Sequence, residues 1–176
     1  MIFVLIGMPG CGKSCMGRGI SGRLKMKAID ADKVIIRRHG KPLQELISEY
    51  GIEGFKKIEE EALLSIDDDN VIISTGGSAV YYDRAMQYYK SRGKIIYLYA
   101  SLETIRARLG DFSKRGVVLA PGQTLESLYE ERCRLYRKYA DITVNCDGSF
   151  FSKYQAITIR KIRATLKKAR IPETQE

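Results

Sequence analysis

Short apolar segments alternate with longer segments of helical periodicity along almost the whole chain. Such alternation favours a parallel sheet that is covered by helices on both faces. The carboxyl ends of parallel strands lie at one edge of the sheet, where ligands bind in folds of this kind. We therefore predict a three-layer α/β fold in one domain. Its strands are expected at residues 2–7, 27–30, 70–75, 94–100 and 141–145. Its helices are expected at about residues 12–25, 43–51, 52–66, 84–92, 101–110, 124–140 and 151–168.

The segment GMPGCGKS at residues 7–14 lies between the first predicted strand and the first predicted helix. It fits the phosphate-loop pattern of a glycine, four residues, then glycine, lysine and serine. Glycines allow backbone N–H groups to turn inward around a polyphosphate, and the helix that follows directs its free N–H groups at the same anion. Lys13 is expected to reach the β and γ phosphates and Ser14 to ligate Mg²⁺. The sequence therefore predicts binding of ATP or GTP, and the Asn-Lys-x-Asp base signature of GTPases is missing.

Two carboxylates, Asp30 and Asp32, follow the second predicted strand directly. This position places them at the ligand edge of the sheet. One can approach Mg²⁺ through water, while the other accepts a hydrogen bond from an acceptor hydroxyl. The alternative is that Asp32 caps a helix that begins at Lys33. Beside a phosphate loop, the interpretation as site residues is favoured.

A segment with glycine and proline at residues 111–123 interrupts the alternation and is predicted to form a short lid. Closure of such a segment excludes water from a transferring phosphoryl group, which is typical of small-molecule kinases. Arg115 lies in this segment, where it could meet the phosphate. The chain has four cysteines without paired spacing and no apolar run of roughly 18 residues, and we expect that it has no leader. We therefore expect a cytoplasmic protein that has reduced thiols and no membrane contact.

The chain is basic, with 30 Lys and Arg against 21 Asp and Glu and a net charge of +9. A balance of this kind suits anionic ligands. Part of the excess lies in RKIRATLKKAR at residues 160–170, which raises the alternative of a nucleic-acid-associated ATPase. However, Ile159, Ile162 and Leu166 form an apolar stripe, so this helix is expected to pack on the core with only its outer face basic. No nucleic-acid partner is therefore expected.

Taken in order, GMPGCGKS, DAD, GFKKIEEEAL, STGGSAV, an arginine in a lid and ERCRLYRKYAD resemble shikimate kinase over about residues 2–146. The resemblance implies a nucleoside-monophosphate-kinase-like P-loop fold, with a five-stranded parallel sheet in the order 2-3-1-4-5. It also implies transfer from ATP, with Mg²⁺, to the 3-hydroxyl of shikimate in aromatic amino acid biosynthesis. The acceptor-binding region would span about residues 31–62. A cytoplasmic monomer with a small-molecule substrate is expected.

The resemblance also assigns a role to each matching residue. Asp32 is the expected base that binds the acceptor hydroxyls, and Asp30 joins Ser14 near the metal. Arg115 is the expected lid arginine on the transferring phosphate, and Arg108 the arginine that stacks near adenine. Nucleotide contacts are expected from Gly10, Cys11, Gly12, Lys13, Ser14, Cys15 and Arg108. Substrate contacts are expected from Asp32, Lys56, Gly76, Gly77, Ser78 and Arg137, of which Arg137 would grip the substrate carboxylate.

Four positions depart from the family pattern. Lys56 stands where an arginine is usual, so the planar bidentate fork toward a carboxylate is lost. Ser78 replaces the third glycine of a triple glycine, the lid reads Arg-Gly-Val-Val, and Arg134 replaces a proline. Three of these changes touch the acceptor or the lid. The alternative function is therefore a kinase of the same fold that acts on another small hydroxy acid.

Overall fold

The computed structural model describes residues 1–110, 122–148 and 151–169, and its centre is a five-stranded parallel sheet. The strands follow the order β2-β3-β1-β4-β5, and every neighbouring pair is parallel. The predicted strands and the predicted sheet order are confirmed. The strands are β1 (Ile2–Ile6), β2 (Lys27–Asp30), β3 (Val71–Ser74), β4 (Gly93–Tyr99) and β5 (Ile142–Asn145).

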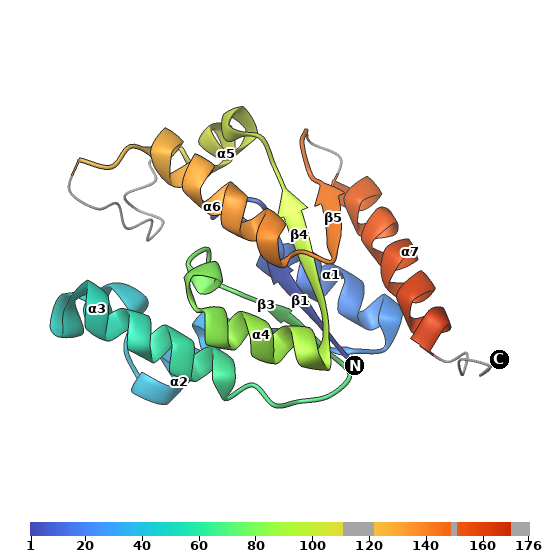
Figure 1. Ribbon diagram of the computed structural model, residues 1–176, viewed down its shortest axis with the longest axis horizontal. Helices are drawn as coiled ribbons and strands as arrows, with labels where there is room; N and C mark the ends of the chain where they lie inside the picture. The colour runs from blue at the N-terminus through green and yellow to red at the C-terminus, as the bar shows by residue number, and fades with distance from the viewer. Residues whose placement is uncertain (111–121, 149–150, 170–176) are drawn as a thin grey trace.

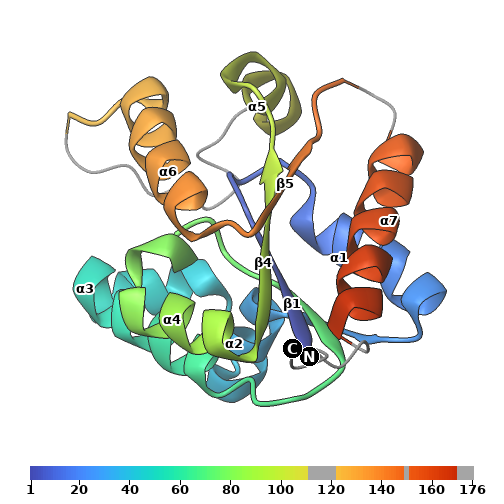
Figure 2. The same cartoon turned by 45° about the vertical axis from the view of Figure 1, so that its right-hand side comes forward.

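Helices cover both faces of this sheet, as Figures 1 and 2 show. One face is covered by α1 and α7, which pack against each other. The opposite face is covered by α4 and α6, with α3 against α4 and α2 against α3. The predicted three layers are therefore confirmed. The helices are α1 (Lys13–Leu24), α2 (Ala31–His39), α3 (Leu43–Leu64), α4 (Asp83–Arg92), α5 (Leu102–Leu109), α6 (Leu125–Tyr139) and α7 (Phe151–Ala169).

The pattern of burial explains why these segments take these positions. All of β1 is inaccessible to solvent, as its uninterrupted apolar sequence requires for the central strand of a covered sheet. The helix α3 is broken at Gly51, whose φ of 67° is left-handed, so the two helices predicted on either side of it are confirmed. Ile159 and Ile162 of α7 are buried, which places the predicted apolar stripe on the core.

The start of α2 does not match the alternative in which Asp32 caps a helix that begins at Lys33. The strand β2 continues into α2 without a loop, so the helix begins at Ala31 and its N-cap is Asp30. Neither capping by Asp32 nor a start at Lys33 is observed, because Asp32 already lies in the first turn. Asp30 makes no side-chain cap hydrogen bond either. Both carboxylates are thus left for other partners.

Two further observations concern the predicted lid and helices that could span a membrane. Arg115 and residues 111–121 of the predicted lid lie outside the described residues. Within the parts of the chain that the structure describes, no helix combines the length and the apolar character needed to cross a bilayer.

Candidate active site

The phosphate loop joins β1 to α1 at the carboxyl edge of the sheet. Gly10 and Gly12 have φ values of 80° and 101°, a left-handed conformation that favours glycine. Gly12 caps α1 without a side-chain hydrogen bond, and the first turn of α1 contains no acidic residue. The N–H groups and the positive end of the helix dipole are therefore available to an anion such as a polyphosphate.

Lys13 lies inside this loop. Its ammonium group donates to the carbonyls of Gly7, at 2.8 Å, and Met8, at 3.0 Å, and the residue is 8% exposed. The thiol of Cys11 is buried 3.9 Å from the same ammonium group, while Cys15 is exposed on α1. The loop thus holds one positive charge where the helix N-terminus already favours negative charge. This arrangement fits the phosphates of a nucleotide.

Asp32 is the most strongly perturbed acid beside the loop. Its pKa is raised to about 6, mainly because the carboxyl group is buried. The negative charge of Asp30 raises the pKa further and that of Glu59 adds to this, while Lys13 acts in the opposite direction. Burial and like charges together make Asp32 a better proton acceptor than an ordinary aspartate, because its pKa is closer to neutrality.

This raised pKa predicts how stability depends on pH. Between about pH 4 and pH 6 the folded state binds more protons at Asp32 than the unfolded state, so the contribution of Asp32 to the free energy of unfolding falls as pH rises. We expect Asp32→Asn to be more stable than the wild type by about 2 kcal/mol near pH 7 and by much less near pH 4. Urea unfolding at both pH values with a chelator present measures this.

Asp68→Asn provides a control of opposite sign. A hydrogen bond from Lys27 lowers the pKa of Asp68, so this variant should lose stability relative to the wild type above about pH 4. An equal difference between Asp32→Asn and the wild type at both pH values would contradict the raised pKa of Asp32.

Mg²⁺ would fit the oxygen donors at this edge. Ser14 lies in the first turn of α1 and Asp30 at the end of β2, and both are partly exposed. Among the described residues, no three His, Cys, Asp or Glu side chains are grouped to hold a metal ion. Mg²⁺ does not require such a group, because it is usually held by one or two protein oxygens together with phosphate oxygens and waters. The residues present therefore fit Mg²⁺ held beside a nucleotide.

Gly76 and Gly77 follow β3 and are surrounded by side chains from other elements. A β-carbon at Gly76 would lie 2.8 Å from Glu59 Oε1 and 3.3 Å from Asp32 Oδ1. A β-carbon at Gly77 would lie 2.8 Å from Pro9 Cδ and 3.1 Å from Arg132 Nη1. These glycines thus allow the acidic groups, the phosphate loop and a cation of α6 to come together.

The close approach at Gly77 predicts a clear effect of substitution. Gly77→Ala would press a methyl group against the Pro9 ring of the phosphate loop, so we expect a loss of about 1–3 kcal/mol in the free energy of unfolding. Gly22→Ala is the matched control, because nothing lies within 4 Å of its added methyl group. That control should be neutral or more stable, since alanine favours a helix interior. Equal urea midpoints for Gly77→Ala and the wild type would contradict the packing.

Arg132 is the cation that interpretation of the sequence did not select. It lies on α6, is 7% exposed, and its guanidinium carbon is 5.4 Å from the centre of the Tyr81 ring. On the same helix face, the Tyr136 hydroxyl donates to the Gly77 carbonyl at 2.7 Å. Leu128, Arg132 and Tyr136 are spaced by four residues and all are buried. This spacing was visible in the sequence and could have identified Arg132 as the inward-facing arginine.

Two cations expected at the substrate are more exposed than Arg132. Arg137 is exposed, and it lies five residues beyond Arg132, so it projects from a different side of α6. Lys56 forms an ion pair with Glu53 at 2.6 Å, with 45% of its side chain exposed. Neither cation is among the three atoms nearest to a β-carbon at Gly76 or at Gly77.

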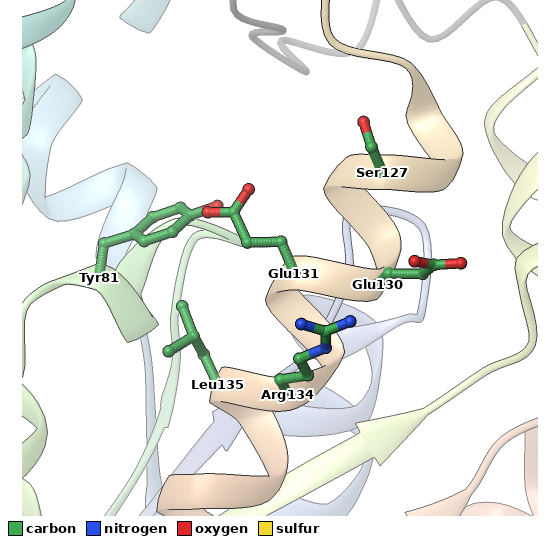
Figure 3. A pocket seen from close by; sticks show the side chains of 6 residues that line it. All are labelled: Tyr81, Ser127, Glu130, Glu131, Arg134 and Leu135. Atoms are coloured by element: carbon green, nitrogen blue, oxygen red, sulfur yellow. The ribbon is translucent and has the colours of Figure 1, made fainter.

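Arg134 lines a separate surface hollow between α6 and the short 3₁₀ helix η1 (Ala79–Tyr81) (Figure 3). The hollow has a volume of about 420 Å³ and does not include Asp32, Glu59 or the glycine pair. Tyr81 lines this hollow and also contacts Arg132: its ring lies near the guanidinium, and its hydroxyl accepts from Arg132 Nε at 3.4 Å. The hollow therefore lies outside the group of acidic residues. Its lining residues are Tyr81, Ser127, Glu130, Glu131, Arg134 and Leu135.

Arg108 marks the opposite end of the phosphate loop. Its guanidinium donates to the carbonyls of Cys146 and Gly148, both at 2.7 Å, and lies 3.5 Å from the carbonyl of Cys11. It thereby connects the loop with the segment after β5. Of the expected nucleotide residues, Lys13 thus lies inside the loop and Arg108 contacts its Cys11 carbonyl, whereas Asp32 and Arg132 lie beside the glycine pair that follows β3.

The fold and this site define a P-loop kinase that acts on a small molecule. Residues 9–163 match the model of the shikimate kinase family. The chain is 35% identical over 149 residues to "Shikimate kinase" of Francisella tularensis subsp. novicida (strain U112), covering 82% of this chain and 85% of that protein. The chain belongs to the shikimate kinase family, and ATP with Mg²⁺ is the cofactor that this family uses.

Solved structures agree with this assignment. "Shikimate kinase from Acinetobacter baumannii in complex with shikimate" superposes with a TM-score of 0.82 at 25% identity, covering 97% of this chain and 94% of that one. The shikimate kinase of Aquifex aeolicus gives a TM-score of 0.80 at 28% identity, covering 97% and 99%. A gluconokinase from Sinorhizobium meliloti, at 13% identity and a TM-score of 0.59, shares the fold alone.

Proposed function

We propose that this chain transfers the γ-phosphoryl group of ATP to the 3-hydroxyl of shikimate, using the residues around Gly76 and Gly77. The observation that carries the proposal is the placement of a raised-pKa acid and a buried arginine beside the same glycine pair. Shikimate has hydroxyl groups and a carboxylate, so it can use both partners at once. Membership of the shikimate kinase family supports the same acceptor.

In this proposal, Asp32 accepts the proton of the attacking hydroxyl. Its raised pKa suits this role, because a general base works best when its pKa is near the working pH. Ser14 and Asp30 would hold Mg²⁺ beside ATP, and the ion would neutralise negative charge on the phosphoryl group that ATP supplies. Lys13 stabilises the negative charge of the phosphates from inside the loop.

Arg132 binds the substrate carboxylate in place of Arg137 and Lys56. Its guanidinium is buried, which strengthens a charge-assisted hydrogen bond, and its planar fork matches a carboxylate. Contact with the Tyr81 ring and hydroxyl restrains the guanidinium on one side. Arg115 keeps its expected role as the lid arginine on the transferring phosphate, and Arg108 its role near adenine.

We further propose that the enzyme works as a cytoplasmic monomer, without a nucleic-acid partner. The four cysteines are free, as in a reducing compartment. Size-exclusion chromatography with light scattering tests the monomer, since a mass near 19.9 kDa is expected and twice that mass would contradict it.

The test of the proposed function is ADP release by the purified protein with ATP and Mg²⁺. Shikimate is compared with no acceptor and with a panel of other small hydroxy acids, including gluconate. Turnover that depends on shikimate supports the proposal. Turnover with another acid and not with shikimate would overturn it and establish the alternative acceptor.

A further inference from the structure

The carboxylate of Glu59 is held by two hydroxyl groups from the segment that follows β3. Glu59 lies on α3 and is 7% exposed. The Ser78 hydroxyl donates to this carboxylate, with both oxygens 2.7 Å away, and the Tyr82 hydroxyl donates to Oε2 at 2.6 Å. In the described part of the chain, no lysine or arginine is paired with Glu59. The orientation of this buried carboxylate is therefore set by Ser78 and Tyr82.

The same carboxylate faces the acceptor side of the site. The position of a β-carbon at Gly76 would be 2.8 Å from Glu59 Oε1, 3.3 Å from Asp32 Oδ1 and 3.6 Å from Ser78 Oγ. Oxygens of Glu59, Asp32 and Ser78 thus all lie within 3.6 Å of one point. Ionised carboxylates only accept hydrogen bonds, and the Ser78 hydroxyl already donates its hydrogen bond to Glu59. A ligand with two neighbouring hydroxyl groups could donate one to each carboxylate.

The carboxylate of Glu59 lies near the negative charge of Asp32. The negative charges of Glu59 and Asp32 repel each other, as the raised pKa of Asp32 reflects. The hydrogen bonds from Ser78 and Tyr82 oppose this repulsion. Without the Ser78 hydroxyl, a buried carboxylate would lose a donor and could turn away from the glycine loop.

We propose that Ser78 and Tyr82 are positioning residues that hold Glu59 so that it accepts a hydrogen bond from a ring hydroxyl next to the one that is phosphorylated. This inference rests on the proposed function, because it takes Asp32 as the partner of the reacting hydroxyl. Ser78 is thereby a determinant of acceptor affinity that acts through Glu59.

The test separates KM from kcat in Ser78→Ala. We expect KM for shikimate to rise about tenfold, the equivalent of one hydrogen bond to a charged group, while kcat and KM for ATP change little. Ser78→Thr keeps the hydroxyl and should restore KM. Tyr82→Phe should act in the same direction as Ser78→Ala. Tyr89→Phe is its matched control, because this buried hydroxyl donates to the Leu63 carbonyl, away from the acceptor residues.

A second experiment tests whether Ser78 acts through Glu59. In a Glu59→Gln background, Ser78→Ala should raise KM no further, and the deoxy-shikimate that lacks the neighbouring hydroxyl should bind wild type and Ser78→Ala equally. An unchanged KM in Ser78→Ala, an equal effect on ATP, or additive effects with Glu59→Gln would overturn the proposal. Failure of the proposed function would give a different result, because the wild type would then turn over another hydroxy acid and not shikimate. The same variants would then be compared on that acid.

Discussion

Asp32→Asn is expected to lower kcat by about 10³, within the 10²–10⁴ range of general acid–base catalysis. Asparagine has almost the same shape as aspartate, so the variant removes the proton acceptor and leaves the packing of α2 in place. The raised pKa of Asp32 favours this role, because the group lies close to neutrality and is still ionised in most molecules above pH 6. Steady-state turnover with saturating ATP and shikimate measures the loss.

Two controls distinguish loss of the base from loss of the fold. Asp68→Asn changes an exposed carboxylate that pairs with Lys27. Because Lys27 begins β2, this pair lies at the opposite end of the parallel sheet from the phosphate loop, and the substitution should leave kcat unchanged. ATP binding by Asp32→Asn, measured by calorimetry, should stay close to that of the wild type, because Lys13 and the loop are unaltered. A kcat within about threefold of the wild type would contradict a role for Asp32 as base.

Arg132→Ala is expected to raise KM for shikimate about 100-fold, because a buried charge-assisted bond to a carboxylate is lost, at about 2–3 kcal/mol. Arg137→Ala is the matched control on the same helix, and its exposed side chain should be dispensable. Arg132→Lys keeps the charge without the planar fork and should fall between the two. KM for ATP should not change in any of them.

Because Arg132 is buried, its replacement could also loosen α6. Thermal melting with and without shikimate separates the two effects: a folded Arg132→Ala protein should melt cooperatively but gain less from added shikimate than the wild type. A larger rise in KM for Arg137→Ala than for Arg132→Ala would contradict the assignment of the carboxylate site.

Most of the fold could be predicted because it depends on local patterns. The apolar runs of β1 and β3, the Gly51 break and the Ser101 cap, which accepts a hydrogen bond from the Thr104 N–H, are readable from short segments. The phosphate loop could also be predicted from a short segment, because the left-handed backbone at Gly10 and Gly12 favours glycine. Sheet order depends on contacts between distant segments, and it was available only through resemblance to a family.

The acceptor side was less predictable for the same physical reason. Arg132 and Arg137 both lie in a run of basic residues, and only the phase of α6 relative to the core separates them. Lys56 could have turned inward, but the pairing with Glu53 at the surface decides its direction. The hydrogen bond from Ser78 to Glu59 joins residues that are 19 positions apart, so no short motif contains both residues.

We propose that Asp32, Glu59 and Arg132 together present the 3-hydroxyl of shikimate to ATP. Phosphorus NMR of the complete reaction tests it most directly, because the signal identifies the atom that is phosphorylated. We predict one new phosphomonoester, coupled to the ring proton at carbon 3, which grows as ADP forms and grows about 10³ times more slowly with Asp32→Asn. Only inorganic phosphate, or a phosphomonoester at another carbon, would contradict it.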